Sequence, residues 1–170
     1  MGAFVFNSVL FNLILRLLAA GGLEGFHQER SIREGEYWRE RALAAPRSTY
    51  RKIHYYERSI EADPAVAAAH LELGEVYYDL AISYGHRDLF DSAVSSLAAA
   101  LKADPSLVPA HYRLGLIYFL LGDFKSSRRE LEEAHRLDPG YLPARNSLKM
   151  LREKLGEGRD NDEIRMTNDE

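Results

Sequence analysis

The side chains that could carry chemistry in this sequence are six histidines and a run of acids near the C-terminus. Histidine can bind metals or transfer protons, and clustered carboxylates can bind calcium. The run Asp160–Glu163 superficially resembles a calcium loop, but it lacks the central glycine and the flanking helices. Four of the histidines have no spacing typical of metal ligands: His27, His54, His86 and His135.

The other chemical signatures are absent from the sequence. There is no glycine-rich phosphate loop and no nucleophile elbow. The chain has no cysteine, which excludes disulfides and thiolate metal sites. The sequence therefore predicts a protein that is not an enzyme and that uses no cofactor and no metal.

The remaining two histidines belong to a sequence motif that occurs twice. Asp-Pro is followed after five residues by His-x2-Leu-Gly-x2-Tyr, once from Asp63 to Tyr77 and again from Asp104 to Tyr118. A third Asp-Pro, at Asp138, leads into Leu148. Self-similarity at a fixed period predicts stacked helical hairpins, each burying its apolar face against its neighbours.

This motif resembles the tetratricopeptide repeat (TPR), a helical hairpin of about 34 residues. Its consensus sequence is aromatic-x2-Leu-Gly-x2-Tyr, followed by Ala-x3-aromatic and Pro. The first copy matches at His70, Leu73, Gly74, Tyr77, Ala93, Leu97, Ala100 and Pro105. The second matches at His111, Leu114, Gly115, Tyr118, Phe124, Ser127, Leu131, Ala134 and Pro139. Histidine replaces the opening aromatic in both copies. The resemblance covers residues 65–139, and it implies an all-α solenoid of about three hairpins plus a capping helix, with His70 and His111 packing between hairpins.

The spacing of the prolines predicts a longer second hairpin. Pro64 and Pro105 are 41 residues apart, whereas Pro105 and Pro139 are 34 apart. The seven extra residues fall between Tyr77 and Ala93 and would add about one turn to each helix, with the turn at residues 85–87. A surface loop is the alternative.

The expected organisation follows from these spacings. Residues 27–66 form a degenerate hairpin, with helices at about 29–44 and 49–62 and with Arg39-Glu40 in place of the Leu-Gly pair. Gly74 and Gly115 lie mid-helix, where glycine costs about 1 kcal/mol, and so indicate a close approach of the paired helix, with Ala93 and Ala100 on the other side. The remaining segments are repeats at 67–107 and 108–141, a capping helix at 142–156 and a disordered acidic tail at 157–170.

Residues 1–22 are expected to form a hydrophobic N-terminal helix. The eighteen residues from 3 to 20 would reach about 27 Å, close to the roughly 30 Å of a bilayer's hydrocarbon core. The helix would span or re-enter a membrane, lie on its surface, or pack against protein. If it spans, the basic residues that follow favour a cytoplasmic repeat domain. The residues expected to carry this attachment are Phe4, Phe6, Asn7, Leu10, Phe11, Asn12, Leu13, Leu15 and Arg16.

The resemblance also implies a binding groove, because in this family the first helix of each hairpin lines a concave surface. The corresponding residues are Tyr37, Trp38, Arg41, Leu71, Glu72, Glu75, Tyr78, Asp79, Tyr112, Arg113, Leu116, Phe119, Leu120, Asn146 and Met150. Aromatic side chains with a few charges suit an extended or helical peptide. The lysines and asparagines with which one TPR variant grips an acidic chaperone tail are absent, which disfavours such a partner.

Charge narrows the classes of partner. The net charge of −4 lies in the tail, which has six acids and two bases, so the rest of the chain is neutral and lacks the basic face that nucleic acid requires. The first hypothesis is a non-enzymatic scaffold or assembly subunit attached to a membrane by its N-terminal helix. The alternative is a self-assembling subunit whose N-terminal helix docks on a neighbouring copy to form a ring or filament.

Overall fold

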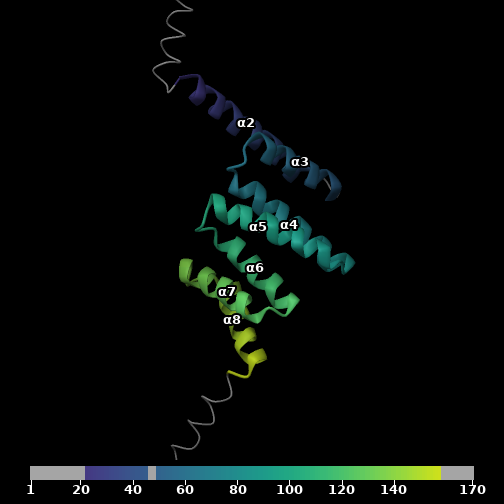
Figure 1. The fold of residues 1–170 in the computed structure, drawn as a ribbon, viewed down its shortest axis with the longest axis vertical. Helices are drawn as coiled ribbons and strands as arrows, with labels where there is room; N and C mark the ends of the chain where they lie inside the picture. The colour runs from purple at the N-terminus through teal and green to yellow at the C-terminus, as the bar shows by residue number, and fades with distance from the viewer. Residues whose placement is uncertain (1–21, 46–48, 158–170) are drawn as a thin grey trace, which may run out of the picture. The chain divides into compact units, whose positions relative to one another are not determined.

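The computed structural model describes residues 22–45 and 49–157, and every regular element in these residues is an α-helix. The hydrophobic helix expected at 1–22 and the tail expected at 157–170 lie outside them, apart from Gly22 and Glu157. The chain divides into two units, Met1–Val66 and Ala67–Glu170. Within each unit, Figure 1 shows consecutive helices paired as hairpins, and the described elements confirm the predicted all-α helical repeat. No helix in the described ranges is long and apolar enough to cross a membrane.

The first unit contains one hairpin of two helices, α2 (Gly22–Ala44) and α3 (Thr49–Ala62). Helix α3 has the predicted bounds, whereas α2 begins at Gly22, well before the expected residue 29. The contacts run antiparallel, since the Ser31 hydroxyl donates to the carbonyl of Ala62 and the buried Ser59 hydroxyl donates to the carbonyl of Gly35 at 2.7 Å. Tyr56, which is 3 % exposed, is the large apolar side chain of this core.

The close approach within this hairpin occurs at Gly35. A Cβ atom there would lie 3.1 Å from the Cβ of Asp63 and 3.3 Å from the carbonyl oxygen of Ser59. The spacing of the repeats instead placed the missing Leu-Gly pair at Arg39-Glu40. The hairpin therefore keeps a glycine contact, but at a place that the repeat pattern does not predict.

The second unit contains two hairpins and a final helix. The first hairpin is formed by α4 (Ala67–Tyr84) and α5 (Arg87–Ala103), and the second by α6 (Val108–Leu121) and α7 (Phe124–Leu137); α8 (Leu142–Leu155) follows. Helices α4 and α5 have 18 and 17 residues, whereas α6 and α7 have 14 each. The seven extra residues therefore lengthen both helices, as predicted, and the turn between them contains Gly85 at φ 69°.

The aspartate of each Asp-Pro pair closes a local turn. Its Oδ1 accepts a hydrogen bond from the backbone N–H two residues later, at 3.1 Å for Asp63, 2.9 Å for Asp104 and 2.9 Å for Asp138. At Asp104 the hydrogen bond from the Ser106 hydroxyl, together with its backbone N–H, also lowers the pKa of the carboxyl group. The turn, together with the proline that follows it, ends one hairpin and starts the next.

The core of the second unit lies between α4, α5 and α6, and a smaller cluster lies between α7 and α8. The larger cluster includes Phe90, Leu97, Leu114 and Ile117, and the smaller one contains Leu131, Leu148 and Leu151. Gly74 and Gly115 are the expected points of close approach. The carbonyl oxygen of Ala93 lies 3.3 Å from the place of a Cβ at Gly74, as expected, but the nearest side chain at each glycine is a leucine. A Cβ at Gly74 would lie 2.7 Å from Cγ of Leu97, and a Cβ at Gly115 would lie 2.6 Å from Cγ of Leu131.

His111, which the family resemblance places between hairpins, instead makes polar contacts within the α6–α7 hairpin and with the turn that precedes it. Its Nδ1 lies 2.8 Å from Oε2 of Glu130 on α7, and its Nε2 lies 3.2 Å from the carbonyl oxygen of Pro105. The two side chains are only 12 % and 11 % exposed. Glu130 and Pro105 thus each place an oxygen atom within hydrogen-bonding distance of one ring nitrogen. The histidine thus joins α6 to α7 and to the preceding turn.

Candidate binding surfaces

The first helices of the repeats form one face in the second unit. Helix α4 contacts α6, and α6 contacts α8. Each helix contributes a stripe with four-residue spacing, which places its members on the same side. The stripes are Leu71, Glu75 and Asp79 on α4, Tyr112, Leu116 and Leu120 on α6, and Asn146 and Met150 on α8. We call these residues, with Glu72, Tyr78, Arg113 and Phe119, the α4–α6–α8 face.

None of the fifteen residues predicted for the groove is among the buried residues of the fold. The most open apolar side chains on the α4–α6–α8 face are Leu120, which is 51 % exposed, and Met150, which is 58 % exposed. Asp79 and Asn146 are exposed as well, and the other members are half-buried. The face therefore offers apolar contacts on α6 and α8 beside carboxylates on α4.

Arg113 links α6 to α4 across this face. Its Nη2 donates to Oε1 of Glu75 at 3.0 Å, and its guanidinium carbon lies 4.7 Å from the centre of the Tyr78 ring. Burial acts to lower the pKa of Arg113, but the hydrogen bond and charge of Glu75, helped by Tyr78 and Asp79, raise it overall. The cation is therefore held by groups of this face.

The aromatic residues predicted as peptide anchors are engaged within the unit. Tyr78 packs edge-on against Phe90 with ring centres 6.2 Å apart, and Phe119 packs against Phe124 at 5.7 Å. Tyr112 packs against Tyr141 at 5.5 Å, and burial, with a smaller contribution from Tyr112, raises the pKa of Tyr141. Sequence reasoning gave these three partners no role at the site. Replacing a predicted anchor would therefore also remove a packing contact.

The first unit brings together the other three predicted groove residues, Tyr37, Trp38 and Arg41. Nη1 of Arg41 donates to the hydroxyl of Tyr37 at 2.7 Å, and the rings of Tyr37 and Trp38 meet edge-on at 5.2 Å. The hydrogen bond with Tyr37 is the main cause of a raised pKa at Arg41, followed by electrostatic attraction to Tyr37 and the hydrogen bond with Tyr55.

Two residues of α3 complete this cluster and were missed by the sequence analysis. The Tyr55 ring stacks on Trp38 at 5.9 Å, and the Arg41 guanidinium lies 5.8 Å from the same Tyr55 ring. Arg58 lies 5.3 Å from the Trp38 ring and pairs with Glu61 at 2.9 Å. Tyr55 and Arg58 stand outside the first-helix positions that the family pattern assigns to binding. Their aromatic and cationic side chains, three residues apart on α3, were the available signal.

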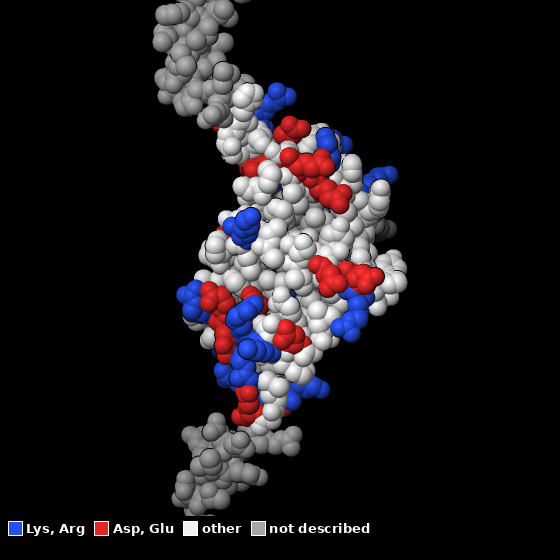
Figure 2. Space-filling model, in the orientation of Figure 1, with Lys and Arg blue, Asp and Glu red and all other residues white. Residues whose placement is uncertain are grey.

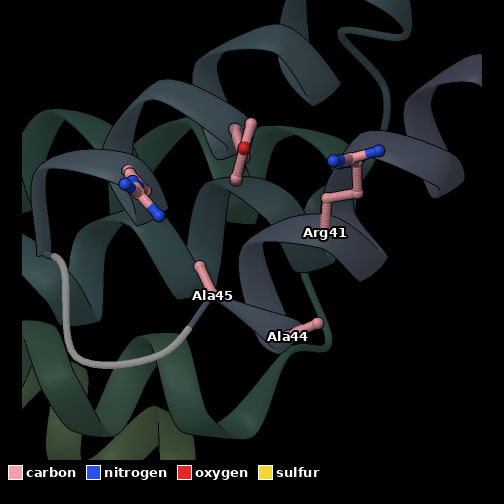
Figure 3. A pocket seen from close by; sticks show the side chains of 5 residues that line it. Arg41, Ala44 and Ala45 are labelled. Carbon is pink, nitrogen blue, oxygen red and sulfur yellow. The ribbon is translucent and has the colours of Figure 1, made fainter.

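A small pocket of about 280 Å³ opens beside this cluster. Figure 3 shows the side chains that line it, with Arg41, Ala44 and Ala45 from the end of α2 and the following residue. Arg51 and Tyr55 from α3 complete the lining. The pocket is therefore bounded by two guanidinium groups, one phenol and two methyl groups.

Charged side chains also gather away from these sites. Figure 2 shows blue and red groups intermixed over α7 and α8. Several are paired, including Arg136 with Glu133 at 2.5 Å on α7 and Lys149 with Glu153 at 3.9 Å on α8. Such mixed charge is typical of a solvated helix surface. In the part of the chain that the structure describes, no group of three or more His, Cys, Asp or Glu side chains is placed to hold a metal ion.

Comparisons with known protein families and solved structures indicate which family this repeat resembles. Residues 108–141 match the tetratricopeptide repeat family. No curated protein sequence matches the chain. Three similar solved structures are TPR domains. The first TPR of Spaghetti (RPAP3), bound to HSP90 peptide SRMEEVD, shares 20 % identity, with 74 % of this chain and 95 % of that chain covered and a TM-score of 0.66.

The other two structures give similar values. The Arabidopsis OM64 TPR domain shares 20 % identity over 73 % of this chain and 98 % of that chain, with a TM-score of 0.64. The Sgt2 TPR domain from Aspergillus fumigatus shares 19 % identity over 75 % of this chain and 82 % of that chain, with a TM-score of 0.61. At these identities the likeness concerns the fold. Residues 108–141 are therefore a tetratricopeptide repeat, and the described helices share the fold of TPR domains.

Proposed function

We propose that the protein is a non-enzymatic protein-interaction scaffold that binds a peptide segment of its partner on the α4–α6–α8 face. The observation that carries this proposal is the exposure of two apolar side chains, Leu120 and Met150, on the adjacent helices α6 and α8. Helix α4 contributes Asp79 and Glu75 to the same face. Apolar anchors beside a few fixed charges are the usual chemistry of peptide recognition. A TPR domain of the same fold is known bound to a peptide, which supports this use of the face.

The charges on the face favour a different peptide from the one bound by the first TPR of Spaghetti. That peptide is acidic at its end, with the sequence Glu-Glu-Val-Asp. Helix α4 has no lysine or arginine, and Arg113 of α6 already pairs with Glu75. Glu75 and Asp79 would repel an acidic peptide. We therefore expect the preferred segment to be apolar, with a neutral or basic group beside Asp79.

Exposed apolar residues of the face should be needed for binding but not for folding. Leu120→Glu and Met150→Glu are each expected to weaken binding of selected peptides by at least about tenfold, because both replace an anchor with a charge. The melting temperature should change little, since both side chains are more than half exposed. Peptides would be selected from a random phage-displayed library on the full chain, and affinities measured by fluorescence anisotropy.

Leu155→Glu is the matched control for this experiment. Leu155 is 40 % exposed and lies on α8 like Met150, but it points about 140° away around the helix. It should leave peptide affinity unchanged. Equal affinity of Leu120→Glu, Met150→Glu and the unaltered chain would rule out this face, and preferential selection of acidic peptides would overturn the assigned charge preference.

Attachment of the scaffold through residues 3–20 is a second part of the proposal and is supported by the sequence alone. The apolar residues of this segment suit a membrane or a neighbouring copy of the chain. Flotation with phospholipid vesicles should retain the full chain with the lipid and leave a version lacking residues 1–21 at the bottom of the gradient. If the full chain instead forms a defined oligomer without lipid, and truncation abolishes it, self-assembly replaces membrane attachment.

A further inference from the structure

We propose that the pocket of the first unit, formed by Arg41, Ala44, Ala45, Arg51 and Tyr55, binds an oxyanion carried by a side chain of a partner protein. Phosphorylated and carboxylate side chains share this chemistry, and the experiment below separates them. The pocket belongs to α2 and α3, so its test is independent of the α4–α6–α8 face.

The first argument concerns the positive charge of Arg41 and the groups that contact it. Several arginines elsewhere in the described residues make ion pairs with glutamates, among them Arg33 with Glu29 on the same helix and Arg58 with Glu61. Arg41 instead hydrogen-bonds to the Tyr37 hydroxyl at 2.7 Å and lies beside the Tyr37 and Tyr55 rings at 5.5 and 5.8 Å. These contacts fix the guanidinium in place but do not neutralise it. A cation that is ordered in advance loses little entropy on binding an anion.

The second argument is the lining of the pocket. A second guanidinium, that of Arg51, enters from α3, and no carboxylate is among the lining residues. A phenol that accepts a hydrogen bond from a guanidinium still has its own hydrogen to donate, so Tyr55 can add a donor for an oxyanion. Guanidinium groups together with hydroxyl donors are a usual means of recognising phosphoryl and carboxylate groups.

The third argument is size. A volume of about 280 Å³ is just below the roughly 300 to 1,000 Å³ of pockets that enclose drug-sized ligands. Ala44 and Ala45 present only methyl groups, so a compact charged group can approach the guanidiniums closely. The pocket therefore suits one terminal group of a larger partner. Tyr37, whose hydroxyl accepts the hydrogen bond from Arg41, is 49 % exposed and offers aromatic contact area to the rest of that partner.

Trp38 provides a direct readout, because it is the single tryptophan of the chain and its ring stacks on Tyr55 of the pocket. The full chain would be titrated at constant ionic strength with three probes: inorganic phosphate, a pentapeptide with a central phosphoserine, and the same pentapeptide with glutamate in that place. Tryptophan fluorescence and the NMR shifts of the Arg41 and Tyr55 amides would report binding. We expect saturable binding of at least one peptide, and the tighter one identifies the oxyanion.

Arg41→Gln should weaken that binding by at least about tenfold, and Tyr55→Phe, which keeps the ring, should weaken it less. Arg33→Gln is the matched control, since it removes the same charge from the same helix but from an existing ion pair, and it should have no effect. A circular-dichroism melt would establish that each variant is folded. The proposal is overturned if neither peptide saturates, if only inorganic phosphate binds, or if Arg41→Gln and Arg33→Gln behave alike.

Discussion

Replacing Gly115 with leucine is expected to lower the free energy of unfolding of the second unit by about 1 to 3 kcal/mol or more. A Cβ atom at this position would lie 2.6 Å from Cγ and 2.7 Å from Cδ2 of Leu131, distances that packed carbon atoms do not adopt. Leu131 is fully buried and has little room to move. The Ser127 hydroxyl also donates to the carbonyl of Gly115 at 2.8 Å, which ties the two helices together at the same point. Denaturant unfolding followed by circular dichroism would measure the change.

The partner residue allows a sharper version of this test. Gly115→Ala and Leu131→Ala should each destabilise the unit, the latter by about 2 to 5 kcal/mol because it leaves a cavity. The double variant should lose less than the sum of the two, since removing the leucine side chain removes the clash. Strict additivity would contradict the close approach. Gly140→Ala is the control, because a Cβ there meets only a side-chain oxygen of Asp138 at 3.2 Å.

Glu130→Leu is expected to cost about 1.5 to 3 kcal/mol, the range for hydrogen bonds that involve charged groups. The variant leaves His111 nearly buried without its partner at 2.8 Å and also removes the acceptor of Arg129. A double variant with leucine at both 111 and 130 should regain much of this loss, because replacing a buried polar pair by apolar groups is often close to neutral.

The control for this pair is Glu132→Leu, an exposed acid on the same helix, which should change the free energy of unfolding by less than about 0.5 kcal/mol. Urea unfolding of the unaltered chain, Glu130→Leu, His111→Leu and the double variant would give the coupling energy between His111 and Glu130. A coupling energy near zero would show that the short contact adds nothing to the hairpin. The experiment therefore separates a stabilising pair from one that merely coexists with apolar packing.

The sequence predicted the second unit well, because its repeat signals are local and strong. Asp-Pro pairs, mid-helix glycines and the proline spacing each reflect a constraint within one hairpin, and they gave the correct positions of the turns and the extra length of α4 and α5. The sequence analysis missed the early start of α2 and the close approach at Gly35 because the first hairpin lacks the repeated motif. Without the repeated motif, the register of a helical pair depends on tertiary contacts, such as the hydrogen bond from the Ser59 hydroxyl to the carbonyl of Gly35.

The candidate sites were predicted less completely, for a physical reason. A family pattern assigns a residue to a helix face but does not reveal which neighbour competes for it. Tyr78 and Phe119 lie at the expected positions, yet each also packs against an aromatic ring of the paired helix. The cluster around Arg41 depends on Tyr55 and Arg58, which come from the second helix of its hairpin. The identity of such partners emerges only when the two helices are placed together.

The unequal lengths of the two hairpins of the second unit have an evolutionary consequence. An insertion of seven residues, divided between α4 and α5, adds about one turn to each helix and keeps every earlier residue on its original side. The added length produces surface: Ile82 and Tyr84, near the tip, are 53 % and 70 % exposed. A hairpin tip of this kind can diverge in length and composition among descendants of one ancestor, while the stack beneath it stays under the selection that preserves its core.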